Sequence, residues 1–131
     1  MMTILLVEDS RILRDRLRSC IGEIPNALLV AETDNEEGAR GHLERHRPDV
    51  AIIDLRLNGG SGLSVIEHIK AVYAATTMIV LTNYAQEEYQ AKCKALGVHY
   101  FFDKAKGNAA ITNLLADMSK SKADEASHSL N

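Results

Sequence analysis

The sequence predicts an α/β fold, a doubly wound (βα)5 arrangement with one five-stranded parallel sheet and helices on both faces. Two observations predict this fold. Short apolar runs alternate five times with amphipathic stretches along the chain. The runs are nearly continuous in Ile, Leu, Val and Phe, which is typical of strands buried on both faces of a parallel sheet. Right-handed crossovers between such strands place helices on both faces.

The predicted strands are the apolar runs 4–7, 27–31, 50–53, 78–81 and 100–102. The stretches between them have helical spacing. The first follows Ser10, a good N-cap residue, and places five side chains on one face: Ile12, Leu13, Leu17, Cys20 and Ile21. The second spans residues 35–46, with Ala39 and Leu43 facing inward, and Pro48 limits its end.

The third predicted helix begins after Ser61, and the fourth spans residues 85–96 and ends at Gly97. The fifth carries apolar residues at i, i+3, i+4 and i+7 spacing: Ile111, Leu114, Leu115 and Met118. The sequence that follows, SKSKADEASHSLN, has a single large aliphatic residue, and its two lysines balance its Asp and Glu. We therefore expect a folded domain over residues 1–118. Residues 119–131 are expected to be a disordered tail or the start of a linker.

Composition narrows the classes of function. The chain has 131 residues, the size of one domain, and a formal net charge of -3. A free-standing nucleic-acid binder normally carries a net basic face, so we expect no nucleic acid as partner. No apolar run approaches the roughly 20 residues that cross a membrane. Cys20 and Cys93 fit neither a metal-binding spacing nor a disulfide framework, which favours reduced thiols in the cytoplasm.

Polar residues follow four of the predicted strands. Glu8 and Asp9 follow the first run, Asp54 the third and Thr82 the fourth, and Lys104 lies two residues past the fifth. Ligands of open α/β sheets bind beyond the carboxyl ends of the strands, so these five side chains are expected to converge at one edge.

Three carboxylates that converge repel one another unless one is protonated or a cation lies between them. Hard oxygen ligands on loops suit Mg²⁺, which takes few protein ligands and keeps several waters. Asp54, at the end of a buried strand, can face the metal and still offer an oxygen as a nucleophile. A phosphoryl group at that oxygen needs its charge neutralised on several sides, for which Lys104 and the Thr82 hydroxyl are available.

The sequence at this point resembles a response-regulator receiver domain of two-component signalling, a chemotaxis-regulator-like, flavodoxin-like fold. The resemblance runs from about Thr3 to Met118. The stretches that carry it are ILLVEDS, RPDVAIIDLRL, GGSGLSVIEHIK, MIVLT and YFFDK.

The resemblance implies a role for each matching residue. Glu8 and Asp9 match the acidic pair that holds Mg²⁺, Asp9 directly and Glu8 through water. Asp54 matches the phosphoacceptor, and the backbone carbonyl of Arg56 matches a further metal ligand. The residues that match the contacts to the phosphoryl oxygens are Thr82 and Lys104, and Thr82 and Phe101 match the switch positions.

The sequence departs from the family pattern at three places. Ala105 follows Lys104 where the family often has proline, so we expect a trans peptide bond there. Asn58 and Gly59 replace a common Pro-Gly, which is expected to loosen the loop after Asp54. Asn83 stands where a small residue is usual.

The resulting prediction is a single receiver domain with the strand order 2-1-3-4-5. It accepts a phosphoryl group on Asp54 from a phosphohistidine donor, requires Mg²⁺ and switches a partner-binding surface; it is not an enzyme. The expected partner is a sensor histidine kinase or a histidine phosphotransfer protein. Self-association through the fourth helix, fifth strand and fifth helix is a further expectation.

Two other classes of function remain open from the sequence. One is an adaptor that keeps the fold and binds partners without phosphorylation. The other is a small hydrolase with Asp54 as a covalent nucleophile, which needs a substrate pocket and a cap or lid that the sequence does not show. Three arginines on one side of the first helix are either a solvated face or a kinase-docking surface: Arg11, Arg14 and Arg18.

Overall fold

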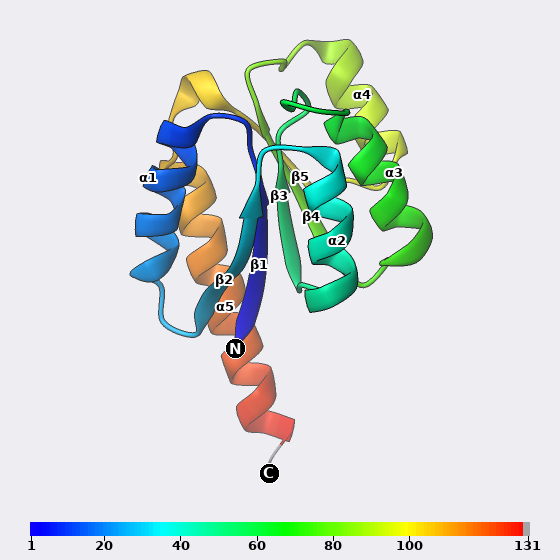
Figure 1. Ribbon diagram of the computed structural model, residues 1–131. Coiled ribbons are helices and arrows are strands. Elements are labelled where there is room, and N and C mark those ends of the chain that lie inside the picture. Colours follow the sequence, from blue (N-terminus) through cyan, green and yellow to red (C-terminus); the bar gives the residue numbers. More distant parts are fainter. Residues whose placement is uncertain (130–131) are drawn as a thin grey trace.

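A computed structural model describes the backbone of residues 1–129 and the side chains of residues 1–125. Within this part of the chain five parallel strands form one sheet (Figure 1). Their bounds are β1 Met2–Val7, β2 Ala27–Thr33, β3 Val50–Ile53, β4 Thr77–Thr82 and β5 Tyr100–Asp103. Each of the five predicted runs therefore forms a strand, extended by at most two residues.

The sheet has the order β2-β1-β3-β4-β5, which confirms the predicted topology. The first strand lies inside the sheet between β2 and β3, and the chain then moves outward through β4 to β5. Between β1 and β3 the order of the strands reverses. The carboxyl ends of these two strands therefore flank the crevice in which ligands of such sheets bind.

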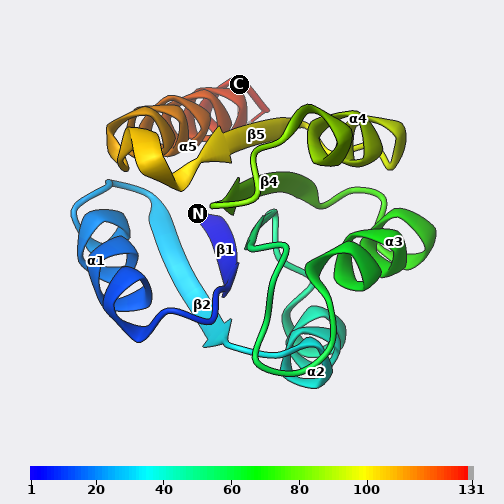
Figure 2. The same cartoon turned by 90° about the horizontal axis from the view of Figure 1, so that it is seen from above.

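The helices cover the two faces unequally, as Figure 2 shows: α1 and α5 lie on one face, and α2, α3 and α4 on the other. Their bounds are α1 Arg11–Gly22, α2 Glu36–His46, α3 Gly62–Val72, α4 Glu87–Ala95 and α5 Ala109–Ser129. A short 3-10 helix, η1 Lys104–Lys106, precedes α5.

Two apolar cores follow from the alternation of side chains along each strand. In β1, Leu5 and Val7 belong to the core beneath α2, α3 and α4. Ile4 and Leu6, one residue out of step, belong to the core beneath α1 and α5. All four side chains are at most 1% exposed. This burial on both faces is why the runs are continuous in apolar residues rather than alternating.

Side-chain caps fix where three of the helices begin. The Ser10 hydroxyl accepts from the Leu13 N–H at 3.3 Å, and the side-chain oxygen Oδ1 of Asn35 accepts from the Gly38 N–H at 2.7 Å. Ser61 caps α3 through the Leu63 N–H at 3.2 Å. Helix α4 begins after Gln86, which makes no side-chain cap, and so starts two residues later than predicted.

The expected apolar face of α1 is wrong at one position. Leu17 and Ile21 are fully buried, but Ile12 is 68% exposed. Ile12 precedes Leu17 by five residues, which turns it about 140° around the helix and away from the sheet. The apolar face is therefore narrower than the sequence interpretation assumed.

The expected disorder after residue 118 also differs from the structure, because α5 continues to Ser129. Ser119 is 1% exposed, and its hydroxyl donates to the Pro25 carbonyl oxygen at 2.6 Å. The Lys122 ammonium forms an ion pair with Asp49 at 2.8 Å. The composition argument counted aliphatic residues, whereas polar contacts and the helix-favouring Ala, Lys and Glu residues carry this part of the helix.

Candidate functional site

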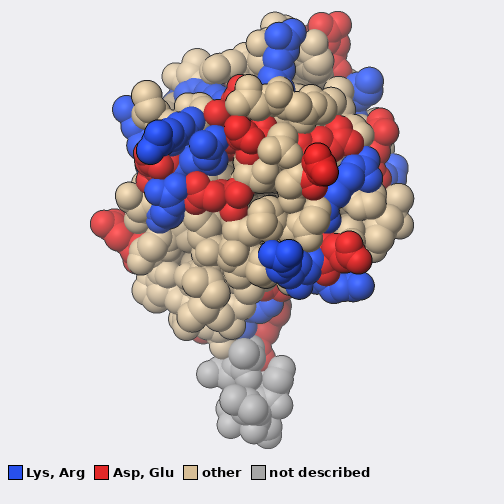
Figure 3. Space-filling model, in the orientation of Figure 1, with Lys and Arg blue, Asp and Glu red and all other residues tan. Residues whose placement is uncertain are grey.

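The candidate site lies at the carboxyl edge of the sheet, where the predicted polar residues gather. Register brings the strand ends level: Val7 pairs with Ile53, and Ile53 pairs with Val80. The Asp54 N–H donates to the Val7 carbonyl oxygen at 2.8 Å, so the residue after β3 is fixed beside the end of β1. Figure 3 shows acidic side chains gathered near this edge, next to basic side chains over α1.

Three carboxylates form the centre of the site. Glu8, Asp9 and Asp54 each offer an oxygen, and these oxygens lie within 4.8 Å of one another. Glu8 is 1% exposed and Asp54 is 4% exposed, whereas Asp9 is open to solvent. The arrangement puts two buried acids behind one that faces outward.

Lys104, the first residue of η1, bridges the two buried acids. Its ammonium lies 2.7 Å from Asp54 Oδ2 and 2.8 Å from Glu8 Oε1. Because β5 ends at Asp103, the next residue, Lys104, lies directly at this edge of the sheet. The peptide bond between Lys104 and Ala105 is trans, as expected from the missing proline.

Burial and hydrogen bonds shift the pKa values of three groups in the site. Burial raises the pKa of Glu8 to about 8, although hydrogen bonds from Lys104 and the Ser10 N–H act against the rise. Burial also acts to raise the pKa of Asp9, but its hydrogen bonds with Glu8 and Asp54 together have the larger effect, so this pKa is lowered. Burial would lower the pKa of Lys104, but its hydrogen bonds to the two acids raise it. With all four groups ionised, three negative charges face one positive charge.

The second oxygen of Asp54 is only weakly engaged. Asp54 Oδ1 accepts from the Arg56 N–H at a long 3.5 Å, whereas Oδ2 holds Lys104. One oxygen is thus fixed by a cation, and the other has room for a new partner.

Thr82 ends β4, next to β3 in the sheet, and is fully buried. Its hydroxyl oxygen accepts from the Tyr84 N–H at 3.2 Å, which leaves the hydroxyl proton free to be donated elsewhere. The Arg56 guanidinium lies over the Tyr84 ring, 4.6 Å from its centroid. Arg56 and Tyr84 follow Asp54 and Thr82 by two residues each, so this stacked pair spans two loops of the site.

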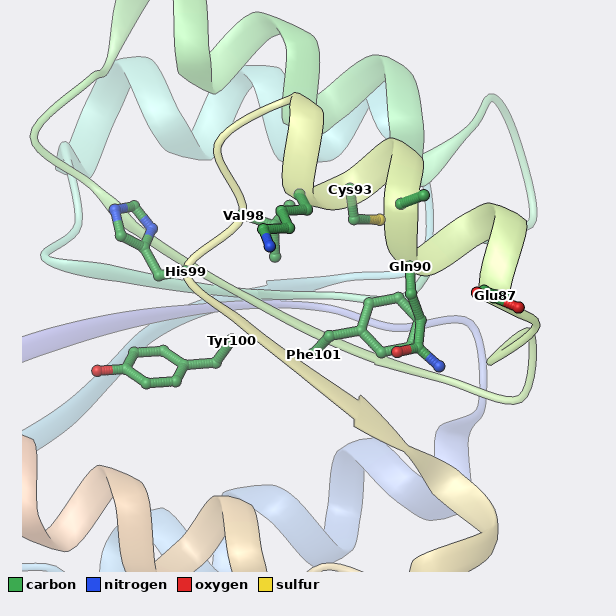
Figure 4. A pocket seen from close by; sticks show the side chains of 9 residues that line it. Glu87, Gln90, Cys93, Val98, His99, Tyr100 and Phe101 are labelled. Carbon is green, nitrogen blue, oxygen red and sulfur yellow. The ribbon is translucent and has the colours of Figure 1, made fainter.

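Phe101, on β5, is half-buried and packs against the core beneath α4. Figure 4 shows its ring between β5 and α4, beside Gln90 and at one end of a groove. Cys93 and Val98 also line this groove, and Glu87 and Lys94 stand at its rim. The structure thus places Phe101 in the wall of a surface between α4 and β5.

The loop after Asp54 is hydrogen-bonded at both Asn58 and Gly59. Asn58 donates from its backbone N–H to the Asp34 carbonyl oxygen and from its side chain to Asp34 Oδ2, both at 2.9 Å. The Glu36 N–H donates to the Gly59 carbonyl oxygen at 2.8 Å. Hydrogen bonds to the start of α2 therefore replace the rigidity that a proline would have given.

Glu36 is a residue of the site that the sequence interpretation missed. Its carboxylate accepts from the Ser61 N–H at 3.1 Å and from the Ser64 hydroxyl at 2.8 Å. Gly60 has φ +83 and leaves no room for a Cβ beside this side chain. Arg14 is a second missed residue: its guanidinium donates to the carbonyl oxygens of Glu8 and Asp9. It does not lie on a solvated face with Arg11 and Arg18.

The three carboxylates fit a hard divalent cation. All the available ligands are oxygens, two of them on adjacent residues of one loop, and the site carries surplus negative charge. Mg²⁺ accepts such a set because it needs only one or two carboxylates and fills its other positions with water. Asp9, the exposed member, leaves the site accessible from solvent.

Comparison with known proteins agrees with the fold and identifies the family. Residues 4–116 match the family described as the response regulator receiver domain. The chain is 35% identical to the virulence transcriptional regulatory protein PhoP of Salmonella typhimurium over 96 residues, which cover 73% of this chain and 41% of PhoP. The curated relatives that it matches are longer, and the chain spans 32%, 41% and 50% of three of them.

Two solved structures have the same fold. A LuxR-family response regulator from Staphylococcus aureus has a TM-score of 0.83 at 22% identity, covering 91% of this chain and 99% of that one. The Mn²⁺-bound form of response regulator Rcp1 has a TM-score of 0.76 at 21% identity, covering 90% and 91%. The chain belongs to the response regulator receiver domain family, the signalling domains of two-component systems. Among the described residues, no helix is both long and apolar enough to cross a membrane.

Proposed function

We propose that this domain accepts a phosphoryl group on Asp54 from a phosphohistidine and thereby changes a partner-binding surface. The observation that carries the proposal is the position of Asp54. It ends a buried central strand, lies with Glu8 and Asp9 within 4.8 Å, and binds Lys104 through one oxygen only. A structural acid at a strand end would not need the neighbouring pair of acids, Glu8 and Asp9, or a second oxygen held only by the long hydrogen bond from the Arg56 N–H.

The transfer is a substitution at phosphorus. Asp54 Oδ1 attacks the phosphorus atom and forms a P–O bond, while the P–N bond of the phosphohistidine breaks. The imidazole nitrogen leaves with the electron pair and takes up a proton. Lys104, already 2.7 Å from Asp54 Oδ2, neutralises charge on the transferred group, and the Thr82 hydroxyl donates to one of its oxygens.

The residues that would hold Mg²⁺ are Asp9, Asp54 and the backbone carbonyl of Arg56, with Glu8 acting through water. The bound ion supplies positive charge to the phosphoryl oxygens during transfer. The surplus negative charge of the site supports this assignment. The Mn²⁺ bound by the structural neighbour Rcp1 is consistent with a divalent cation here.

The phosphoryl group would act on the surface through Thr82 and Phe101. A phosphoryl oxygen that accepts from the Thr82 hydroxyl draws the β4–α4 loop toward Asp54. The half-buried Phe101 then settles inward, and the groove between α4 and β5 changes shape. The surface of α4, β5 and α5 would then bind a partner or a second copy. The donor would be a sensor histidine kinase or a histidine phosphotransfer protein, and the domain would be its substrate rather than an enzyme.

The experiment is incubation with acetyl phosphate, with and without Mg²⁺, followed by intact mass spectrometry. The expected result is the mass gain of one phosphoryl group, dependent on Mg²⁺ and lost at alkaline pH. Asp54→Asn should abolish the gain. Asp103→Asn is the matched control because Asp103 also ends a strand at this edge, yet its carboxylate caps the Ala105 N–H.

Each alternative gives a different outcome. No mass gain in the wild type would favour an adaptor that signals by binding alone. A small hydrolase would turn over acetyl phosphate and release inorganic phosphate continuously, and no stable phosphorylated form of the protein would accumulate. A mass gain that persists in Asp54→Asn would contradict the assignment of the acceptor.

A further inference from the structure

Arg14, on α1, binds the backbone on both sides of Asp9. One nitrogen of its guanidinium, Nη1, donates to the Glu8 carbonyl oxygen at 2.8 Å and to the Asp9 carbonyl oxygen at 3.2 Å. These two carbonyls belong to the peptide groups immediately before and after the Cα of Asp9. A residue has only two soft backbone dihedrals, so fixing both peptide groups fixes the direction in which its side chain leaves the chain.

The loop that carries Asp9 is held at its two ends, where the Glu8 N–H donates to the Thr33 carbonyl oxygen at 2.9 Å and Ser10 caps α1. It comprises three residues, from Glu8 to Ser10, between β1 and α1. The Glu8 side chain is buried and accepts from the Ser10 N–H at 3.0 Å. Asp9 is exposed, so its side-chain direction depends on its hydrogen bonds with Glu8 and Asp54 and on its backbone rather than on packing.

Arg14 is itself held in place. Its side chain is 17% exposed, and its Nε lies 3.7 Å from Glu32 Oε1 on β2. Arg18, one turn further along α1, also pairs with Glu32, donating from its Nε to Glu32 Oε2 at 2.8 Å. Arg18 is 50% exposed and makes no contact with the loop among the contacts described for its side chain. Glu32, on the outer strand β2, therefore holds the Arg14 side chain, and Arg14 in turn holds the backbone of the loop at Asp9.

We infer that Arg14 is a positioning residue for the divalent cation: it holds the backbone of Asp9 so that this carboxylate stays aimed at the cation. The inference rests on the proposed function, since it concerns the same site. Groups that orient metal ligands from behind commonly change metal affinity by about 10-fold to 100-fold when they are removed.

The sign of the effect separates positioning from simple electrostatics. Arg14 carries a positive charge near a site for a cation. If the charge alone mattered, removing it would strengthen Mg²⁺ binding because a repulsion disappears. If Arg14 positions Asp9, removing it weakens Mg²⁺ binding in spite of the relieved repulsion.

The experiment compares Arg14→Ala with Arg18→Ala, a matched control. Both variants remove an arginine of α1 that is paired with Glu32, but only the first removes the contacts to the loop. Mg²⁺ is titrated into each protein and followed by the backbone amide signals of Asp9 and Asp54. Urea unfolding without Mg²⁺ gives the stability of each variant. We expect about tenfold weaker Mg²⁺ binding for Arg14→Ala and unchanged or slightly tighter binding for Arg18→Ala.

Each outcome decides the inference. Wild-type or tighter Mg²⁺ affinity in folded Arg14→Ala would overturn it, and so would an equal loss in both variants, which would indicate a general weakening of α1. If Arg14→Ala does not fold, Arg14→Gln, which keeps part of the side-chain volume, replaces it. Weaker Mg²⁺ binding in Arg14→Gln would then support the inference, and wild-type or tighter binding would overturn it. A wild-type protein that binds no Mg²⁺ would instead contradict the proposed function itself.

Discussion

Lys104 is the residue on which the site's charge balance depends. It is the partner of two acids that are almost fully buried, and its own side chain is 13% exposed. Two carboxylates left together in such a place repel each other and lack solvent to screen the repulsion. The raised pKa of Glu8, caused first by burial, shows how closely the site approaches that condition.

Replacing Lys104 should therefore cost stability as well as function. Lys104→Met is expected to lower the free energy of unfolding by about 3 kcal/mol, the usual scale for removing one partner of a buried ion pair. Mg²⁺ should recover part of the loss because it supplies positive charge at the same carboxylates. Urea unfolding with and without Mg²⁺ measures both effects. Lys106→Met, an exposed lysine of the same short helix, should change little; an equal loss there would contradict the explanation.

Arg56 and Tyr84 each follow a residue of the site by two positions, and we expect the pair to cover an acyl phosphate on Asp54 from water. Their stacked contact of 4.6 Å joins the loops after β3 and β4. The double variant Arg56→Ala with Tyr84→Ala is expected to shorten the half-life of phosphorylated Asp54, since hydrolysis needs water in line with the P–O bond. Arg47→Ala is the control, because Arg47 stacks on Tyr73 at 5.7 Å and away from the site. A half-life that is unchanged or longer in the double variant counts against shielding.

At the scale of elements, Glu36 couples α2 to the loop that supplies Arg56. Its carboxylate accepts hydrogen bonds from Ser61 and Ser64 at the start of α3. Glu36→Ala is expected to lower the free energy of unfolding by about 1 kcal/mol, because two half-buried donors lose their acceptor. Amide hydrogen exchange in residues 58–62 should also become faster. Glu37→Ala, its exposed neighbour in the same helical turn, tests whether loss of a first-turn acid alone accounts for the change.

The far end of α5 is tied to the sheet through Asp49. Burial would raise the pKa of Asp49, but hydrogen bonds from Lys122 and Thr3 outweigh it and lower the pKa. A lowered pKa in the folded state means that the ionised form stabilises the fold above the ordinary value of 3.8, and that this contribution is lost as the pH falls below it.

Acidification should therefore loosen the end of α5 before it unfolds the domain. The amide signals around Lys122 are expected to shift as the pH falls below 3.8. In Asp49→Asn the same shift should already be present at neutral pH and should show no acid step. An acid step of wild-type size in Asp49→Asn would assign the transition to another group.

At the scale of the whole molecule, the pattern of apolar runs predicted a parallel sheet and the edge at which the polar residues meet, and the strand order was predicted only once the family resemblance was in place. It could do so because strand burial and the position of strand ends are written in consecutive residues. Arg14 and Glu36 could not be found in this way. Their partners are carbonyl oxygens or residues far along the chain, and Glu36 meets Ser61 across 25 positions. The end of α5 was missed for the same reason, since Ser119 is anchored on Pro25.

A switch that spans the molecule should be visible in the amide spectrum. Adding beryllofluoride, a phosphoryl mimic, with Mg²⁺ is expected to shift signals around Asp54 and also across residues 85–118. Reversing a 1:99 population takes about 5.5 kcal/mol of differential interaction, which contacts of one phosphoryl group with Lys104, Thr82 and the metal can supply. Asp54→Asn should show neither set of shifts. Shifts confined to the loops around Asp54 would contradict the proposed change at Phe101.

Helix α5 connects the site to the opposite edge of the sheet. It begins just after the turn that holds Lys104 and runs for 21 residues, about 30 Å, past that edge (Figure 1). Its far half is held by the hydrogen bond from Ser119 to Pro25 and by the ion pair of Lys122 with Asp49. A tilt of the Lys104 turn about a newly placed phosphoryl group would therefore have to strain these two contacts before it reached the far edge of the molecule.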